Sequence, residues 1–233
     1  MMFADAFSFA DALRASEILL GFAFALQSIE HLHRFADERR LFFPRLFLAL
    51  LLLAGFYTPW ILLALLLLGT LILQRFQGPY NGGSDRMGLL ILLCLCAAHF
   101  APSAYWQNMA LGYLALQLIL SYVISGWVKI INSDWRRGKA LCEVFEYSAY
   151  PVSENLRQWA QSPRLLFGMA WCVMLFELLF PLALFTQTGL IIALFIAAVF
   201  HFANACLFGL NRFFWIWLAA YPAILWFQAA VIL

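Results

Sequence analysis

Long apolar stretches dominate the chain, and short polar segments separate them. A transmembrane helix needs about 20 apolar residues, and stretches close to this length recur along the whole sequence. The pattern predicts helices over about 14–33, 87–100, 107–131, 165–185, 190–210 and 213–233. Residues 41–76 are too long for one span, and Gly55 and Pro59 inside them predict a hairpin of two helices. We therefore expect an all-α polytopic membrane bundle of about eight transmembrane helices.

The longest polar segment, residues 132–164, separates two of these predicted helices. Within it, apolar side chains are interleaved with two glutamates: Leu141, Val144, Phe145 and Tyr147 with Glu143 and Glu146. This pattern is typical of short amphipathic helices that lie in the membrane interface. In the helix over 165–185, Pro181 removes the hydrogen bond to the carbonyl of Glu177, so a local kink is expected there.

The composition supports a membrane location. The chain of 233 residues is 65% hydrophobic and only 11% charged, and its mean hydropathy is +0.87. A soluble domain carries about 25% charged residues, so a water-soluble fold is excluded. We expect a single transmembrane domain over residues 1–233 with no soluble domain and with the lipid bilayer as its partner. A net charge of +2 is too small to indicate a nucleic-acid partner.

The basic residues indicate how the chain crosses the membrane. Lys and Arg gather in residues 34–40, 75–86 and 132–164 and at Arg212, whereas the other predicted turns have none. With eight spans, all of the basic segments fall on one face, which the positive-inside rule makes cytoplasmic. Lys129, near the end of its helix, would then lie toward the cytoplasm of a multi-pass membrane protein.

Ionisable and amide side chains inside apolar helices are the candidate site residues. Lys129 lies near the end of one helix, Glu177 lies well inside another, and His201 and Asn204 share a face of a third. Such groups are costly in a membrane and often mark a function. Structural interpretations stay open: Lys129 as an interfacial anchor, Glu177 as a link to a neighbouring helix, and His201 with Asn204 as a satisfied pair.

Metal and redox sites are not predicted. His31 and His33 are two residues apart, so they do not share a helical face, and chelation on a helix uses a spacing of four. The five cysteines include no C-x-x-C pair, and four of them lie in apolar segments. We interpret them as packing residues and expect no metal.

Three segments resemble a known family. Tyr122–Trp135, with Gly126, Lys129 and Asp134, is similar to the family pattern Y-F-I-A-G-x-x-K followed by D-W. Tyr80–Leu89 resembles a loop that begins with an aromatic residue and Asn, and Phe200–Pro222 resembles F-H-x-x-N-x-x-L-F and a later L-A…P. In this order, the segments resemble the HTTM (horizontally transferred transmembrane domain) family over about 75–225. That family includes the membrane domain of vitamin K-dependent γ-glutamyl carboxylase and its bacterial relatives.

The resemblance implies a lysine that deprotonates a quinol. Lys129 would be the base, in the neutral form that burial away from water favours, and His201 would be a second catalytic residue. The binding residues would be Asn81, Asp134, Trp135, Glu177 and Asn204. The cofactor would be a quinol or quinone, and the location the inner (cell) membrane of a bacterium. The family places its lysine toward the lumenal, or outer, face, whereas the basic loops place Lys129 toward the cytoplasm.

Two departures argue against γ-carboxylation itself. The family loop reads Asn-Asn-His where this chain has Asn81-Gly82-Gly83, and no counterpart of the large lumenal domain of the carboxylase is expected. The hypothesis is therefore a quinol- or lipid-binding membrane enzyme related to the carboxylase. The alternative is a non-catalytic accessory or maturation protein whose segment 132–164 docks a membrane or cytoplasmic partner. A transporter is less favoured, because no internal repeat or paired broken helices are evident.

Overall fold

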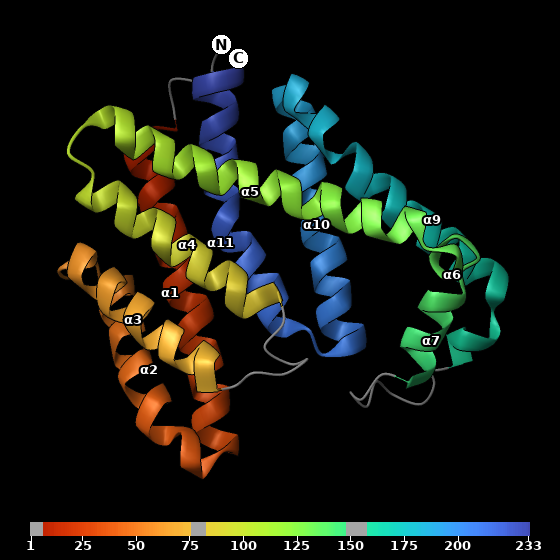
Figure 1. Cartoon of the computed structure of the whole chain (residues 1–233), viewed down its shortest axis with the longest axis horizontal. Coiled ribbons are helices and arrows are strands. Elements are labelled where there is room, and N and C mark those ends of the chain that lie inside the picture. Colours follow the sequence, from red (N-terminus) through yellow and green to blue (C-terminus); the bar gives the residue numbers. More distant parts are fainter. Residues whose placement is uncertain (1–6, 76–82, 148–157) are drawn as a thin grey trace. The chain divides into compact units, whose positions relative to one another are not determined.

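The computed structural model describes residues 7–75, 83–147 and 158–233, and every element in these ranges is helical (Figure 1). The first two helices are α1 (Phe9–Arg34) and α2 (Arg39–Ala54). Six further described segments are long and apolar enough to cross a membrane: α3 (Thr58–Arg75), α4 (Gly83–Phe100), α5 (Ala104–Ile131), α9 with its 3-10 turn (Pro163–Phe185), α10 (Gln187–Phe208) and α11 with its final turn (Asn211–Ile232). The all-α membrane architecture is confirmed.

Short helices connect these segments. A 3-10 turn (Ala36–Glu38) joins α1 to α2, and α6 (Ser133–Arg136), α7 (Lys139–Tyr147) and a second 3-10 turn (Gln158–Gln161) follow α5. The described residues form two compact units: residues up to Leu116 with Arg212–Ile232, and Gln117–Asn211. The first half of α5 belongs to the first unit and its second half to the second. A single domain over residues 1–233 stays a prediction.

Several helices begin earlier than the sequence predicts. α1 begins at Phe9 rather than near Arg14, because Ser8 and Asp11 form a capping box. The Ser8 hydroxyl accepts from the Asp11 N–H (3.2 Å), and the Asp11 carboxylate accepts from the Ser8 N–H (3.0 Å). These two bonds satisfy backbone donors that an uncapped helix start leaves unpaired. α4 and α5 also begin four and three residues before the predicted 87 and 107, respectively.

In the first unit, α1 packs on α2, and α3 packs on both α2 and α4. The predicted hairpin is confirmed: α2 ends at Ala54, and Gly55 takes the left-handed conformation (φ 77°) that closes the helix. The core between these helices contains fully buried side chains such as Leu20, Phe42, Leu52 and Leu92.

A partly buried charge network closes the end of α2. Arg14 donates hydrogen bonds to the carbonyls of Leu52 (3.0 Å) and Leu53 (2.7 Å), which lie in the last turn of α2. Glu17 balances this charge: one carboxylate oxygen lies 3.0 Å from the Arg14 guanidinium and the other 2.6 Å from His99 Nε2. Arg14 and Glu17 of α1 therefore have a structural role, because the carbonyls at the end of a helix need hydrogen-bond donors.

Arg14→Met is expected to destabilise the protein by about 1–3 kcal/mol, because it leaves the helix-end carbonyls and one oxygen of the buried Glu17 carboxylate without their donor. Thermal unfolding in detergent measures the change. Arg40→Met is the control, since Arg40 is an exposed residue of α2. Equal melting temperatures for the two variants would show that the Arg14 network contributes nothing to stability.

In the second unit, α7 lies against α9. Leu141 and Phe145 of α7 are buried with Leu166, Ala170 and Met174 of α9. The predicted amphipathic pattern of this segment thus corresponds to a helix whose apolar face covers another helix. The segment between α7 and the following 3-10 turn, residues 148–157, lies outside the described residues.

α9 changes its geometry where the sequence places Pro181. The α-helix ends at Leu179, and Phe180–Phe185 continue as a 3-10 turn. The predicted helix over 165–185 is therefore regular only as far as Leu179. Pro181 has no N–H to bind the carbonyl of Glu177, which is the physical reason for the change.

Candidate functional site

Four residues of α5 form a stripe at helical spacing: Tyr122, Ser125, Gly126 and Lys129. Side chains three, four and seven residues apart share a face of a helix. Tyr122 and Gly126 are buried, and Ser125 and Lys129 are half-buried, whereas the neighbouring Trp127 and Val128 are exposed. The stripe therefore faces protein, and the opposite side of the helix presents the apolar surface that lipid requires.

Lys129 forms a short ion pair with Glu177 of α9. Its Nζ lies 2.6 Å from each carboxylate oxygen of Glu177 and 2.6 Å from Ser125 Oγ, to which it also donates. The Ser125 hydroxyl donates in turn to Glu177 Oε1 (3.1 Å). Glu177 is only 3% exposed. Its carboxylate therefore accepts three hydrogen bonds from two side chains in a region of apolar helices, where an unpaired charge is costly.

Gly126 allows α5 and α9 to approach closely enough for this pair. A Cβ atom at position 126 would lie 2.9 Å from Leu178 Cγ, 3.0 Å from Glu177 Cβ and 3.0 Å from the Leu178 nitrogen. Small residues permit such contacts between membrane helices. The sequence Ser125-Gly126 therefore provides both a hydroxyl for the ion pair and the space for the glutamate.

Trp135 covers the lysine from α6. Its ring centroid lies 5.4 Å from Lys129 Nζ, a cation–π distance. Asn132 caps α6 by accepting from the Asp134 N–H (2.8 Å), and Arg136 donates to the Ile130 carbonyl of α5 (2.6 Å). The short α6 is thus fixed to the end of α5. Asp134 lies in the first turn of α6, where its negative charge favours the helix start.

A second polar pair lies about two turns of α5 before Lys129. Tyr122 Oη lies 3.0 Å from His201 Nε2 of α10, and both residues are buried. The Tyr122 ring stacks on Phe180 with centroids 4.3 Å apart. Asn204 follows His201 by three residues, and its backbone carbonyl accepts from the Leu210 N–H (3.3 Å) at the end of α10.

The structure thus brings Lys129, Glu177 and Trp135 together, and it places His201 on Tyr122. Roles for Asp134 and Asn204 in substrate binding stay predictions, and Asn81 lies outside the described residues. Ser125 and Tyr122 were not among the predicted site residues. Their spacing of four and seven residues from Lys129 was the signal that could have identified them.

The chain was compared with models of known protein families. The HTTM domain family matches residues 98–229, more than half of the sequence. The chain belongs to the HTTM family. Neither the curated proteins nor the solved structures contain a significant match. In this HTTM protein, the Lys129–Glu177 pair, its serine and tryptophan neighbours and the Tyr122–His201 pair all lie inside the matched region. The predicted resemblance is therefore confirmed at the level of the family.

Proposed function

We propose that this HTTM protein is a membrane enzyme that binds a quinol, or another lipid-soluble phenol, and uses Lys129 as its base. The ion pair between Lys129 and the buried Glu177 carries the proposal. Ionisable groups within membrane helices are retained mainly where they have a function. A hydrophobic substrate can reach such a site from the lipid, whereas a polar substrate would have to be desolvated first.

The ion pair supports a proton exchange that would activate the lysine. In an apolar environment, moving one proton from the ammonium to the carboxylate removes both charges and leaves a neutral amine beside a carboxylic acid. The amine would then accept the phenolic proton of a bound quinol, giving a quinolate beside a Lys129 ammonium. Glu177 keeps the first proton, so the total number of protons is conserved.

The exposure of the two side chains fits these roles. The Lys129 side chain is 17% exposed, whereas that of Glu177 is 4% exposed. The lysine is therefore the member of the pair that a ligand can reach. The neighbouring Trp135 offers a ring on which a flat aromatic molecule can stack. The Tyr122–His201 pair provides further polar groups in the second unit.

Lipid extraction followed by mass spectrometry tests the binding step. Wild-type protein purified in mild detergent is expected to retain a quinone or quinol. The Lys129→Ala variant is expected to retain about tenfold less, which corresponds to a loss of ~1.4 kcal/mol of binding free energy. Lys139→Ala is the matched control, because Lys139 is an exposed lysine of α7. Equal quinone contents in wild type and Lys129→Ala would contradict the proposal.

The six candidate spans do not include α1 and α2. We infer that α1 and α2 also cross the bilayer, which gives eight spans, and that α7 lies in the interface. The length of α1 (26 residues) is sufficient for a span, and α2 (16 residues) is just below the minimum of about 17, a mismatch that local thinning of the bilayer can accommodate. We also propose that the protein belongs to the inner membrane of a bacterium.

A second candidate function is that of a non-catalytic accessory protein. It is favoured by the outer face of α7, where Tyr147 is 75% exposed and Lys139 and Glu143 form an exposed ion pair (3.4 Å). A partner protein would bind this face of the segment 132–164. Tyr147→Ala with Glu143→Ala would then abolish co-purification of the partner and leave quinone retention unchanged.

A further inference from the structure

An open groove lies in the first unit, and its lining does not include the residues of the Lys129–Glu177 pair. Its volume is about 980 Å³, and the end of α4, the first half of α5 and the end of α11 line it. Pockets for small ligands have volumes of about 300–1,000 Å³. The groove is therefore large enough for a whole ligand of this size.

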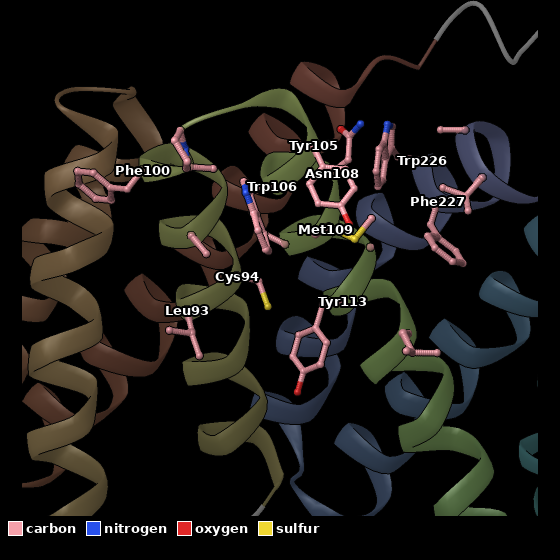
Figure 2. Close-up of a pocket in the computed structure, with 18 residues that line it drawn as sticks. Leu93, Cys94, Phe100, Tyr105, Trp106, Asn108, Met109, Tyr113, Trp226 and Phe227 are labelled. Atoms are coloured by element: carbon pink, nitrogen blue, oxygen red, sulfur yellow. The ribbon is translucent and has the colours of Figure 1, made fainter.

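Aromatic side chains dominate the walls of the groove. Figure 2 shows Phe100, Tyr105, Trp106 and Trp226 around it. Tyr105 and Trp106 are 63% and 57% exposed. Exposed tyrosine and tryptophan are typical of the level where lipid headgroups meet the hydrocarbon. The groove thus begins near the interface and extends along apolar helices.

The polar atoms of the groove lie mainly toward one end. Asn108 and Tyr105 lie in the first turns of α5, whereas Leu93 and Cys94 lie deeper along α4, where the Tyr113 hydroxyl is a further polar atom (Figure 2). Among the described residues that line the groove, none is Asp, Glu, Lys, Arg or His. The walls therefore offer hydrogen bonds to a neutral head and apolar contacts to a chain, but no ion pair to a charged headgroup.

We propose that this groove is a binding site for an uncharged membrane lipid, with a small neutral head near Asn108 and its chain along α4 and α5. The turn 101–103 between α4 and α5 has no Lys or Arg, so the positive-inside rule favours the non-cytoplasmic face for this end of the two helices. A diacylglycerol, with one free hydroxyl and two acyl chains, has this chemistry. The site is independent of Lys129.

Gly112 offers a way to fill the groove without disturbing the fold. It lines the groove, and a Cβ there would meet only Phe227, at 3.5–3.6 Å, an ordinary contact. Gly112→Leu therefore places three further carbons into the space. Gly168→Leu is the matched control, because a Cβ at this exposed position of α9 meets nothing within 4 Å. Both changes replace glycine by leucine within a helix.

Native mass spectrometry of the delipidated full chain tests the proposal with two added lipids: dioleoylglycerol and anionic dioleoylphosphatidylglycerol. One molecule of a neutral lipid is expected to bind to the wild type and to Gly168→Leu. Gly112→Leu is expected to bind at least about tenfold more weakly. Lys129→Ala is expected to keep this binding, which separates it from the proposed quinol site.

Three results would overturn the proposal. They are stronger binding of the anionic lipid, equal binding to Gly112→Leu and Gly168→Leu, and a broad distribution of lipids with no dominant single copy, which indicates annular lipid only. If Gly112→Leu fails to fold, Trp106→Ala replaces it. Trp106 is exposed, so its loss removes one wall of the groove and is expected to weaken binding of the neutral lipid.

Discussion

Replacing Lys129 with methionine is expected to lower the free energy of unfolding by ~3–5 kcal/mol, because it leaves a buried carboxylate without its cation. Methionine replaces the four-carbon stem of lysine with an apolar chain of four atoms and removes the ammonium. Glu177, 3% exposed, retains only the hydroxyl of Ser125 as a donor in the network described above. It must then either stay charged in an apolar region or take up a proton, and both cost stability.

The double variant Lys129→Met with Glu177→Met isolates the interaction. Removing both charges replaces the ion pair by apolar side chains, which is often neutral or stabilising. The double variant is therefore expected to recover most of the loss, so that the two single effects are strongly non-additive. Unfolding in mixed micelles at increasing SDS fractions provides the measurement.

Lys139 provides the control for the Lys129 and Glu177 variants. The Lys139–Glu143 pair has side chains that are 62% and 49% exposed and a distance of 3.4 Å. An exposed pair contributes about 0–1 kcal/mol, so Lys139→Met is expected to change stability little. If Lys129→Met is no more destabilising than Lys139→Met, Lys129 is an interfacial anchor and not the partner of a buried acid.

Gly126→Ala is expected to have the next largest effect, because the added methyl group separates α5 from α9. It would lie 2.9 Å from Leu178 Cγ and 3.0 Å from the Leu178 nitrogen, and backbone cannot move aside cheaply. Overpacking of this kind costs about 1–3 kcal/mol, although alanine favours the helix by up to about 1 kcal/mol. The variant is also expected to weaken the Lys129–Glu177 contact and to reduce quinone retention.

Gly168→Ala is the control for this substitution. The same change on the open surface of α9 meets no atom within 4 Å, so only the helix propensity remains and the protein is expected to become slightly more stable. Opposite signs for the two variants, measured by thermal unfolding in detergent, are the predicted result. A stabilising effect of Gly126→Ala would show that the two helices do not approach as closely as described.

The sequence predicts the helices well because the membrane imposes a length and a composition on each of them. Gly55 and Pro59 predicted the hairpin of α2 and α3, and Pro181 predicted the irregular end of α9. The start of α1 was missed because the capping box of Ser8 and Asp11 is a local hydrogen-bond pattern that hydropathy does not detect.

The candidate site was predicted in part. Lys129 and Glu177 could be selected because each is an ionisable group in an apolar helix. Their direct contact could not be derived, because 48 residues separate them and it depends on how α5 and α9 pack around Gly126. The contact between Tyr122 and His201, 79 residues apart, depends on tertiary packing in the same way. Helical spacing alone would have added Ser125 and Tyr122 to the list of candidates.

The ionisation of a bound quinol tests the proposed role of Lys129 most directly. A reduced quinol is added without oxygen to the protein in lipid nanodiscs, and the absorbance of the quinolate is recorded as the pH is raised. Wild type is expected to form quinolate at a lower pH than the quinol alone, and Lys129→Met is expected to abolish this difference. Identical titrations with wild type, with Lys129→Met and without protein would contradict the assignment of Lys129 as a base.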